Sequence, residues 1–129
     1  MKKPESMGGK TLLCVEDEDL QLKLRTLLFE SAGFNVLAAQ SAAEGIDAVR
    51  NHQVDLVLMD YSLSDKNGAA VAEEMNKIRP GLPVVILSGS PSLPETGNFV
   101  DLWLRKADIE PETLVQEVTR LIERRSLGN

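Results

Sequence analysis

The sequence has one cysteine, one histidine and no long apolar run, and each shortage excludes a class of protein. A single cysteine excludes a disulfide framework, and Cys14 lies in an apolar, strand-like run, so we expect it to be buried and reduced. His52 has no second histidine or nearby cysteine, which argues against a metal site there and favours a solvated loop residue. No apolar run approaches the length that spans a membrane.

Charge and composition further restrict the binding partners, the location and the kind of domain. A formal net charge of −6 argues against direct binding to nucleic acid. The basic start MKKPESMGGK is followed by no apolar segment of a secretion signal, so a cytoplasmic location is expected. The 129 residues are 43% hydrophobic and 26% charged, as in one soluble globular domain. We expect a loose tail over 1–9, a domain over 10–125 and a C-terminal tail over 126–129.

Strand-like and helix-like segments alternate along the chain. Short apolar runs predict buried strands, and apolar residues three or four apart predict helices, each on one face. Such alternation predicts a parallel sheet with right-handed crossovers and helices on both faces. The expected strands are 11–15, 34–39, 54–59, 84–87 and 102–104, and the expected helices are 20–33, 41–51, 68–78 and a last one from Pro111. The first helix is expected to bury Leu20, Leu24, Leu27 and Leu28, the third Val71, Met75 and Ile78, and the last Leu114, Val118, Leu121 and Ile122.

The segment Val54–Gly68 organises the rest of the chain, because an apolar strand ends there in Asp60 and a polar loop follows. An aspartate in that position is often only a helix cap or a turn residue. Glu16 and Asp17, however, follow the first strand, Ser88 ends the fourth and Lys106 follows the fifth. Each has an ordinary alternative, such as a helix-start acid, a turn serine or a surface lysine. Together, at one edge of a parallel sheet, they indicate a functional site.

Three acids at one edge would repel one another unless a cation joins them. Carboxylates with a backbone carbonyl and waters suit a hard divalent ion, above all Mg²⁺. One carboxylate could then act as a nucleophile toward phosphorus and form an aspartyl phosphate. A nearby lysine and hydroxyl would complete the surroundings of the phosphoryl oxygens.

Four motifs carry a resemblance to a known family: the acid pair in LLCVEDE, the segment DLVLMDYSLSDKNG, the strand end PVVILSGS and the lysine in LWLRK. With these motifs, residues 11–125 resemble a response-regulator receiver domain of two-component signalling, similar to chemotaxis receivers. The resemblance implies an α/β, flavodoxin-like, doubly wound parallel sheet of five strands in the order 2-1-3-4-5.

The same resemblance implies roles for particular residues. Asp60 would accept a phosphoryl group from a phosphohistidine on a sensor histidine kinase or a histidine phosphotransfer protein. Mg²⁺ or Mn²⁺ would be held by Glu16, Asp17, Asp60 and the backbone carbonyl of Ser62. Ser88 and Lys106 would bind the attached phosphoryl group, and Trp103 is either a switchable aromatic or a plain packing residue. Such a domain is a signalling module with a downstream partner, and it catalyses only its own phosphorylation and dephosphorylation.

The sequence departs from the family pattern at three places. Ala107 stands where the family usually has proline after the lysine, and one residue is added before Pro111. Ser64 replaces a common proline in the loop after Asp60. The interval SPSLPETGNFVD before the fifth strand is short by about one turn and contains two prolines and a glycine. We therefore predict that the helix between the fourth and fifth strands is shortened or missing, and that the common dimer face is not used.

Two other functions remain open at this stage. A pseudo-receiver that binds partners without phosphorylation is the first alternative, favoured by Ala107 and the short interval and opposed by the intact acids. A Mg²⁺-dependent hydrolase with an aspartyl-phosphate intermediate is the second. It ranks last, because it would normally have a second acid two residues after the nucleophile, where this chain has Ser62.

Overall fold

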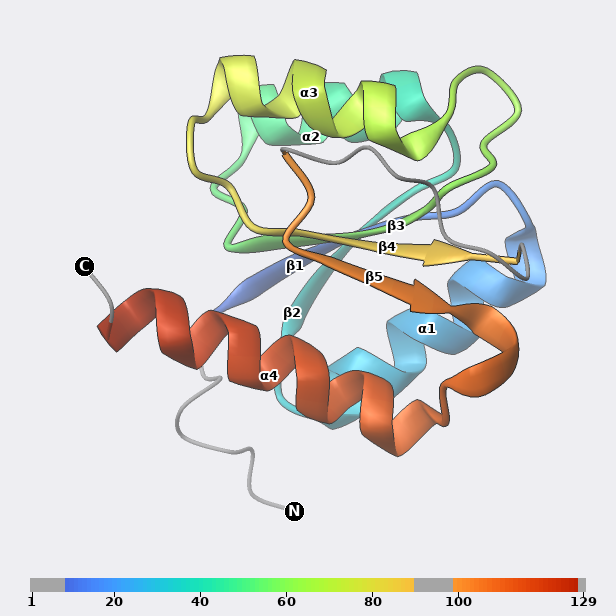
Figure 1. The fold of residues 1–129 in the computed structure, drawn as a ribbon, viewed down its shortest axis with the longest axis vertical. Helices are drawn as coiled ribbons and strands as arrows, with labels where there is room; N and C mark the ends of the chain where they lie inside the picture. Colours follow the sequence, from blue (N-terminus) through green and yellow to red (C-terminus); the bar gives the residue numbers. More distant parts are fainter. Residues whose placement is uncertain (1–8, 90–98, 128–129) are drawn as a thin grey trace.

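The structure is a computed structural model that describes residues 9–89 and 99–127. Strands and helices alternate as the sequence predicts (Figure 1). The strands are β1 (Thr11–Val15), β2 (Asn35–Ala39), β3 (Leu56–Asp60), β4 (Val84–Ser88) and β5 (Leu102–Arg105). The helices are α1 (Asp19–Ser31), α2 (Ala42–Asn51), α3 (Gly68–Ile78) and α4 (Pro111–Leu127), with a short 3-10 turn, η2 (Lys106–Asp108), before α4.

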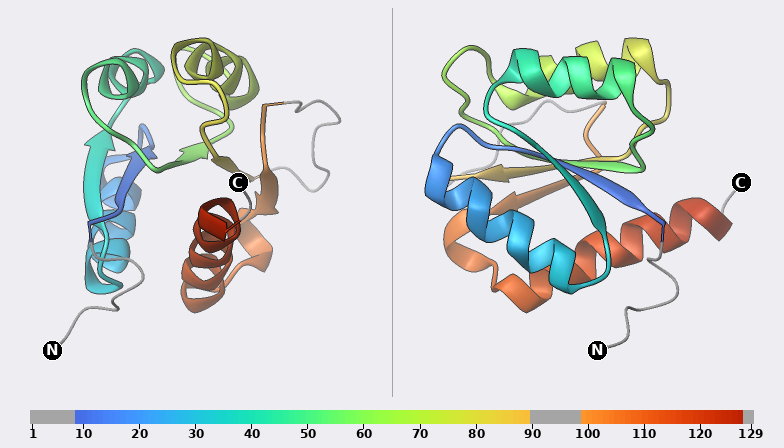
Figure 2. Two further views of the ribbon diagram at one scale, coloured as in Figure 1. Left: turned by 90° about the vertical axis from the view of Figure 1, so that its left-hand side faces the viewer. Right: turned by 180° about the vertical axis from the view of Figure 1, so that it is seen from behind.

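The five strands form one parallel sheet in the order β2-β1-β3-β4-β5, which confirms the predicted flavodoxin-like topology. Helices α2 and α3 cover one face, and α1 and α4 cover the other, so the molecule has three layers (Figures 1 and 2). Each face packs its own apolar cluster between sheet and helices. Every residue of β3 and β4 is buried, as expected for central strands covered on both sides.

Local sequence explains where the helices begin. The Ser41 hydroxyl accepts a hydrogen bond of 3.1 Å from the Glu44 amide, which confirms the predicted cap of α2. The Asn67 side chain caps α3 in the same way, through the Ala70 amide at 2.9 Å. Pro111 is the first residue of α4, where a missing N–H leaves no hydrogen bond unmade.

The predicted buried face of α1 is wrong for three of its four leucines, and only Leu28 is half-buried and packs against the core. Leu20, Leu24 and Leu27 are 66%, 52% and 61% exposed, whereas Leu22, Arg25 and Phe29 are the buried residues of this helix. Four leucines at helical spacing suggested one arc, but the helix packs on the sheet through the arc that contains Phe29. Leu20, Leu24 and Leu27 therefore form an exposed apolar strip along α1, called the leucine strip below.

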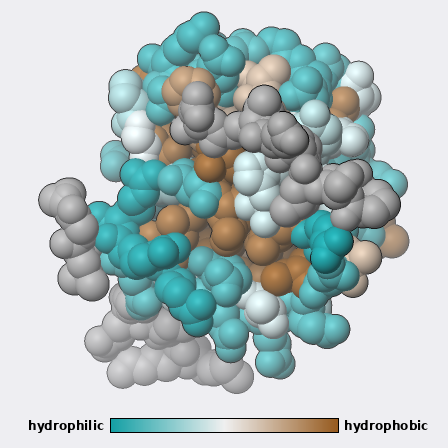
Figure 3. All heavy atoms as spheres, in the orientation of Figure 1, coloured by the Kyte–Doolittle hydropathy of each residue, from teal (hydrophilic) through white to brown (hydrophobic). Residues whose placement is uncertain are grey.

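Strand β5 is an edge strand, and Leu102, Trp103 and Leu104 on it are only half-buried. Figure 3 shows hydrophobic atoms gathered in the middle of that face, between the α3 and α4 layers. The predicted loss of the helix before β5 falls mainly on residues 90–98, which lie outside the described residues, so it stays a prediction. So do the limits of the domain and the avoidance of the common dimer face.

The predictions for Cys14 and His52 agree with the structure. Cys14 is a free, fully buried cysteine, and His52 is exposed. Burial raises the pKa of the Cys14 thiol to about 12, so this thiol stays protonated at neutral pH. Within the described ranges, no helix is both long enough and apolar enough to cross a membrane.

Candidate functional site

The sheet register brings the ends of four strands to one edge. Val15 pairs with Met59, so Glu16 follows β1 next to Asp60 at the end of β3. Asp60 pairs with Leu87, and Ser88 pairs with Arg105, so Ser88 and Lys106 lie at the same edge. Parallel strands thus deliver the predicted residues to one place, although up to 90 positions separate them in sequence.

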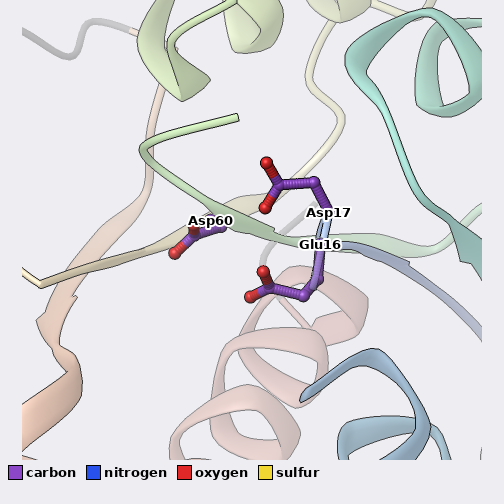
Figure 4. Close-up of side chains that lie close together, drawn as sticks. All are labelled: Glu16, Asp17 and Asp60. Carbon is purple, nitrogen blue, oxygen red and sulfur yellow. The ribbon is translucent and has the colours of Figure 1, made fainter. Parts of the chain in front are cut away.

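Three acids meet at that edge. Glu16, Asp17 and Asp60 each offer a carboxylate oxygen, and these oxygens lie within 4.8 Å of one another. Figure 4 shows Glu16 and Asp17 directing their carboxylates toward the side of Asp60. Glu16 and Asp60 are buried, and Asp17 is half-buried. An all-oxygen donor set of this kind fits a hard divalent cation.

Lys106 brings a positive charge to the cluster. Its Nζ lies 2.6 Å from Asp60 Oδ1 and 3.7 Å from Glu16 Oε1. The lysine begins η2, and the turn is closed by an ion pair of 2.6 Å between Arg105 and Asp108. The side chain of Lys106 is 34% exposed, so it touches both the buried acids and the solvent.

A second cation, Arg25, was missed by sequence reasoning. Its Nη1 donates to Glu16 Oε1 at 2.6 Å, and the arginine is buried on the inward face of α1. The other oxygen, Oε2, accepts the Glu18 amide at 3.0 Å. A signal was present, because Leu22, Arg25 and Phe29 are spaced along one helical face. Leu20, Leu24 and Leu27 give a competing helical spacing, so spacing alone does not decide which face is buried.

Comparison with known proteins then decides the family. The family model of the response regulator receiver domain matches residues 12–105. The chain belongs to this family.

The relatives of this receiver domain agree with that result. It is 38% identical over 116 residues to the transcriptional regulatory protein GlrR of Escherichia coli (strain K12), a match that covers 87% of this chain and 26% of that protein. The chain therefore spans about a quarter of the length of that relative.

Solved receiver structures share its fold. The CheY-like response regulator receiver domain protein from Methanospirillum hungatei JF-1 has a TM-score of 0.85 at 26% identity, covering 93% of this chain and 98% of that one. A receiver domain from Clostridium thermocellum has a TM-score of 0.84 at 27% identity, covering 93% and 99%. Nothing in these similarities supports the pseudo-receiver alternative.

The loop after Asp60 contacts both the acid cluster and α2. The Ser64 hydroxyl, at the position where the family commonly has proline, donates to Asp17 Oδ2 at 3.0 Å. Asp65 accepts the Ala42 amide at 3.0 Å and the Ala43 amide at 3.2 Å, at the start of α2. The Ala42 hydrogen bond is the main reason that the pKa of Asp65 lies below its usual value. Neither contact follows a local sequence pattern.

A glycine allows this loop to return close to the site. The Gly68 amide donates to the Tyr61 carbonyl at 2.6 Å. A Cβ at this position would lie 2.9 Å from the backbone oxygen of Asp60 and 3.1 Å from the Cα of Tyr61. Only glycine fits here without moving the backbone that carries Asp60.

Ser88, Ser62 and Trp103 are the remaining predicted site residues, and they differ in burial and in what they contact. Ser88 is 1% exposed at the end of β4. Ser62 forms an isolated antiparallel bridge with Asn67 in the loop, so its role as a metal ligand stays a prediction. Trp103 lies on β5, with its ring centroid 5.9 Å from that of Tyr61, the residue after Asp60. The Lys106–Ala107 bond is trans, since no cis peptide occurs in the described part of the chain.

Charge and burial act in opposite directions on Asp60. Burial raises the pKa of its carboxyl above the ordinary value, and the charge of Glu16 adds to this effect. The hydrogen bond and charge of Lys106, and the charge of Arg25, lower it. The net shift is upward, because burial outweighs the opposing hydrogen bond and charges of Lys106 and Arg25.

Proposed function

We propose that this receiver domain accepts a phosphoryl group on Asp60 from a phosphohistidine of a sensor histidine kinase or a histidine phosphotransfer protein. The observation that carries the proposal is the setting of Asp60, a buried carboxylate at the end of β3, 2.6 Å from Lys106 and grouped with two further acids. Its function is to signal, and its only catalysis is its own phosphorylation and dephosphorylation.

The proposed cation is Mg²⁺, or Mn²⁺ in its place. Glu16, Asp17 and Asp60 would hold it, with the Ser62 carbonyl as a further ligand, since their oxygen donors match a hard cation. When bound, such a cation neutralises charge on the phosphoryl oxygens during transfer. Mg²⁺-dependent labelling is therefore part of the proposal.

The reaction forms one bond and breaks another. A carboxylate oxygen of Asp60 attacks phosphorus, the bond from phosphorus to the histidine nitrogen breaks, and its electron pair stays on the imidazole. In this structure Lys106 forms an ion pair with Asp60 Oδ1. After transfer it would donate hydrogen bonds to the phosphoryl oxygens instead. Ser88, buried at the adjacent strand end, would donate its hydroxyl to the same group.

Phosphorylation would then change a binding surface. Trp103 packs near Tyr61, directly after Asp60, so a change at the phosphoacceptor could reach the half-buried edge strand β5. We propose a downstream partner on that side and a cytoplasmic location.

The donor is proposed to dock on α1. The leucine strip is apolar and exposed, as interaction surfaces are. A groove of about 560 Å³ beside it is lined by Leu24, Leu28 and Ile109 and reaches Lys106. A helical partner bound there would bring its phosphohistidine to the edge that holds Asp60.

The test is the intact mass of the protein after incubation with acetyl phosphate and Mg²⁺. We expect one phosphoryl adduct, lost in EDTA and in Asp60→Asn. Asp65→Asn is the matched control, because it removes an exposed acid from the same loop and should still be labelled. Failure of the wild-type protein to gain an adduct, with folding intact, would contradict the proposal.

A further inference from the structure

We propose that Arg25 is a built-in counter-ion of the acid cluster and sets how strongly that cluster attracts a divalent cation. This inference rests on the cation site of the proposed function. It assigns to Arg25 a part in the charge balance of the site, through its ion pair with Glu16.

Arg25 is buried, so its charge requires an oppositely charged partner. It lies on the inward face of α1 between Leu22 and Phe29, and its side chain is 10% exposed. An arginine so deeply buried is rare and costly unless an opposite charge compensates it. The compensating group is Glu16, whose side chain is only 1% exposed and whose Oε1 lies 2.6 Å from Arg25 Nη1.

Lys106 does not duplicate this contact. Its Nζ lies 3.7 Å from the same oxygen of Glu16 and is bonded instead to Asp60 at 2.6 Å. The Glu18 amide occupies Glu16 Oε2 at 3.0 Å. Among the described residues, Arg25 is thus the cation in hydrogen-bond contact with Glu16, and its charge is the one that most directly offsets this carboxylate.

The net charge of the cluster explains why Arg25 would affect the affinity for a cation. The three carboxylates face Arg25 and Lys106, which leaves one net negative charge. Loss of Arg25 alone would leave two, at a buried place where charges are weakly screened. The acids would then repel one another more strongly without a cation and attract Mg²⁺ more strongly with one.

Titration calorimetry with MgCl₂ measures this directly. We expect Arg25→Met to tighten Mg²⁺ binding by about tenfold, as Coulomb's law suggests for one charge removed from a partly screened site. Arg25→Lys keeps the charge and should restore an affinity close to that of the wild type. Lys23→Met is the matched control, because it removes an exposed positive charge from the same helix, and its effect should be negligible.

Thermal unfolding separates this role from a merely structural one. If Arg25 balances charge, Arg25→Met lowers the melting temperature most in EDTA, and Mg²⁺ raises it by more than in the wild type. If Arg25 only fills space, the melting temperature falls equally with and without Mg²⁺, which would overturn the proposal. So would Mg²⁺ binding by Arg25→Met that is equal to or weaker than that of the wild type.

Further comparisons keep the inference testable if Arg25→Met does not fold. The double variant Glu16→Gln with Arg25→Met removes both charges, and it should bind Mg²⁺ more tightly than Glu16→Gln alone. Equal or weaker binding would overturn the inference. If the wild type binds Mg²⁺ but the Arg25 variants do not bind it more tightly than their reference proteins, only the role of Arg25 is refuted. Absence of Mg²⁺ binding from all of them would refute the cation site as well.

Discussion

The pKa of Asp60 is subject to opposing effects. Burial and Glu16 disfavour its charge, while Lys106 and Arg25 favour it, and the net effect raises its pKa. A carboxylate held charged against its environment costs folding free energy, which is why stability and reactivity are linked at this residue.

Asp60→Asn is predicted to stabilise the metal-free protein at neutral pH. Because the pKa of Asp60 is raised from 3.8, the native state holds its proton more tightly than the unfolded state does. Stability therefore falls as pH rises through the window from 3.8 to the raised pKa and stays lower above it. The variant lacks this loss, so urea unfolding in EDTA should show a higher free energy of unfolding than the wild type at pH 7.

The pH dependence of that gain identifies its cause. It should shrink as pH falls and vanish below 3.8, where the carboxyl is protonated in both states. A gain that is the same at pH 3 and pH 7 would show that the amide stabilises the site for some other reason.

Gly68 supports the same residue through backbone contact. Gly68→Ala should destabilise the protein by about 1–3 kcal/mol, because the added methyl group meets the Asp60 carbonyl and the neighbouring backbone. It should also slow labelling by acetyl phosphate. Gly89→Ala is the control, since a Cβ there meets no atom within 4 Å. Wild-type stability and labelling rate in Gly68→Ala would contradict the close approach.

At the scale of elements, α1 combines two functions on opposite faces. Leu22 and Phe29 pack it on the sheet, and Arg25, on the same face, contacts Glu16. The leucine strip faces solvent. The helix therefore joins the core to the acid cluster and leaves an apolar surface exposed, on which the proposed phosphoryl donor would dock.

The same substitution at two leucines of α1 tests this assignment. Leu22→Ala should cost about 2–4 kcal/mol of unfolding free energy, as for a buried leucine. Leu24→Ala should cost under about 1 kcal/mol, because Leu24 is half exposed. Leu24→Ala should also slow phosphoryl transfer from a histidine phosphotransfer protein while leaving labelling by acetyl phosphate unchanged. Equal costs at both positions would contradict the observed face.

The elements differ in how far sequence reasoning could predict them. Apolar runs located the strands, and the rule that parallel strand ends share an edge predicted the grouping of Glu16, Asp17, Asp60 and Lys106. The face of α1 was not predictable from spacing alone, because leucines occur on both of its sides. Ser64 and Asp65 make tertiary contacts with Asp17 and α2, and no local pattern encodes such contacts.

At the scale of the whole molecule, the parallel sheet is what makes the site possible. Residues 16–17, 60, 88 and 106 come from four strand ends and are placed by one register. Cation binding to such a site should stabilise the folded chain, since the unfolded chain lacks the cluster.

Removal of Mg²⁺ with EDTA should accordingly lower the melting temperature. At ten times its Kd, Mg²⁺ adds about 1.4 kcal/mol, or a shift of about 3–6 °C for a chain of this size. Asp17→Asn removes an acid from the cluster and should abolish most of the shift. Differential scanning fluorimetry measures this shift. If Mg²⁺ raises the melting temperature of the wild type and of Asp17→Asn by the same amount, the bound cation lies elsewhere.

The most direct test of the central claim is to locate the phosphoryl group itself. Protein labelled with acetyl phosphate and Mg²⁺ is treated with borohydride, which reduces an aspartyl phosphate to homoserine, and its peptides are sequenced by mass spectrometry. The account predicts homoserine at position 60 and unchanged aspartate at positions 17 and 65. Homoserine at another position, or an adduct that leaves residue 60 unmodified, would contradict the assignment of Asp60 as the phosphoacceptor.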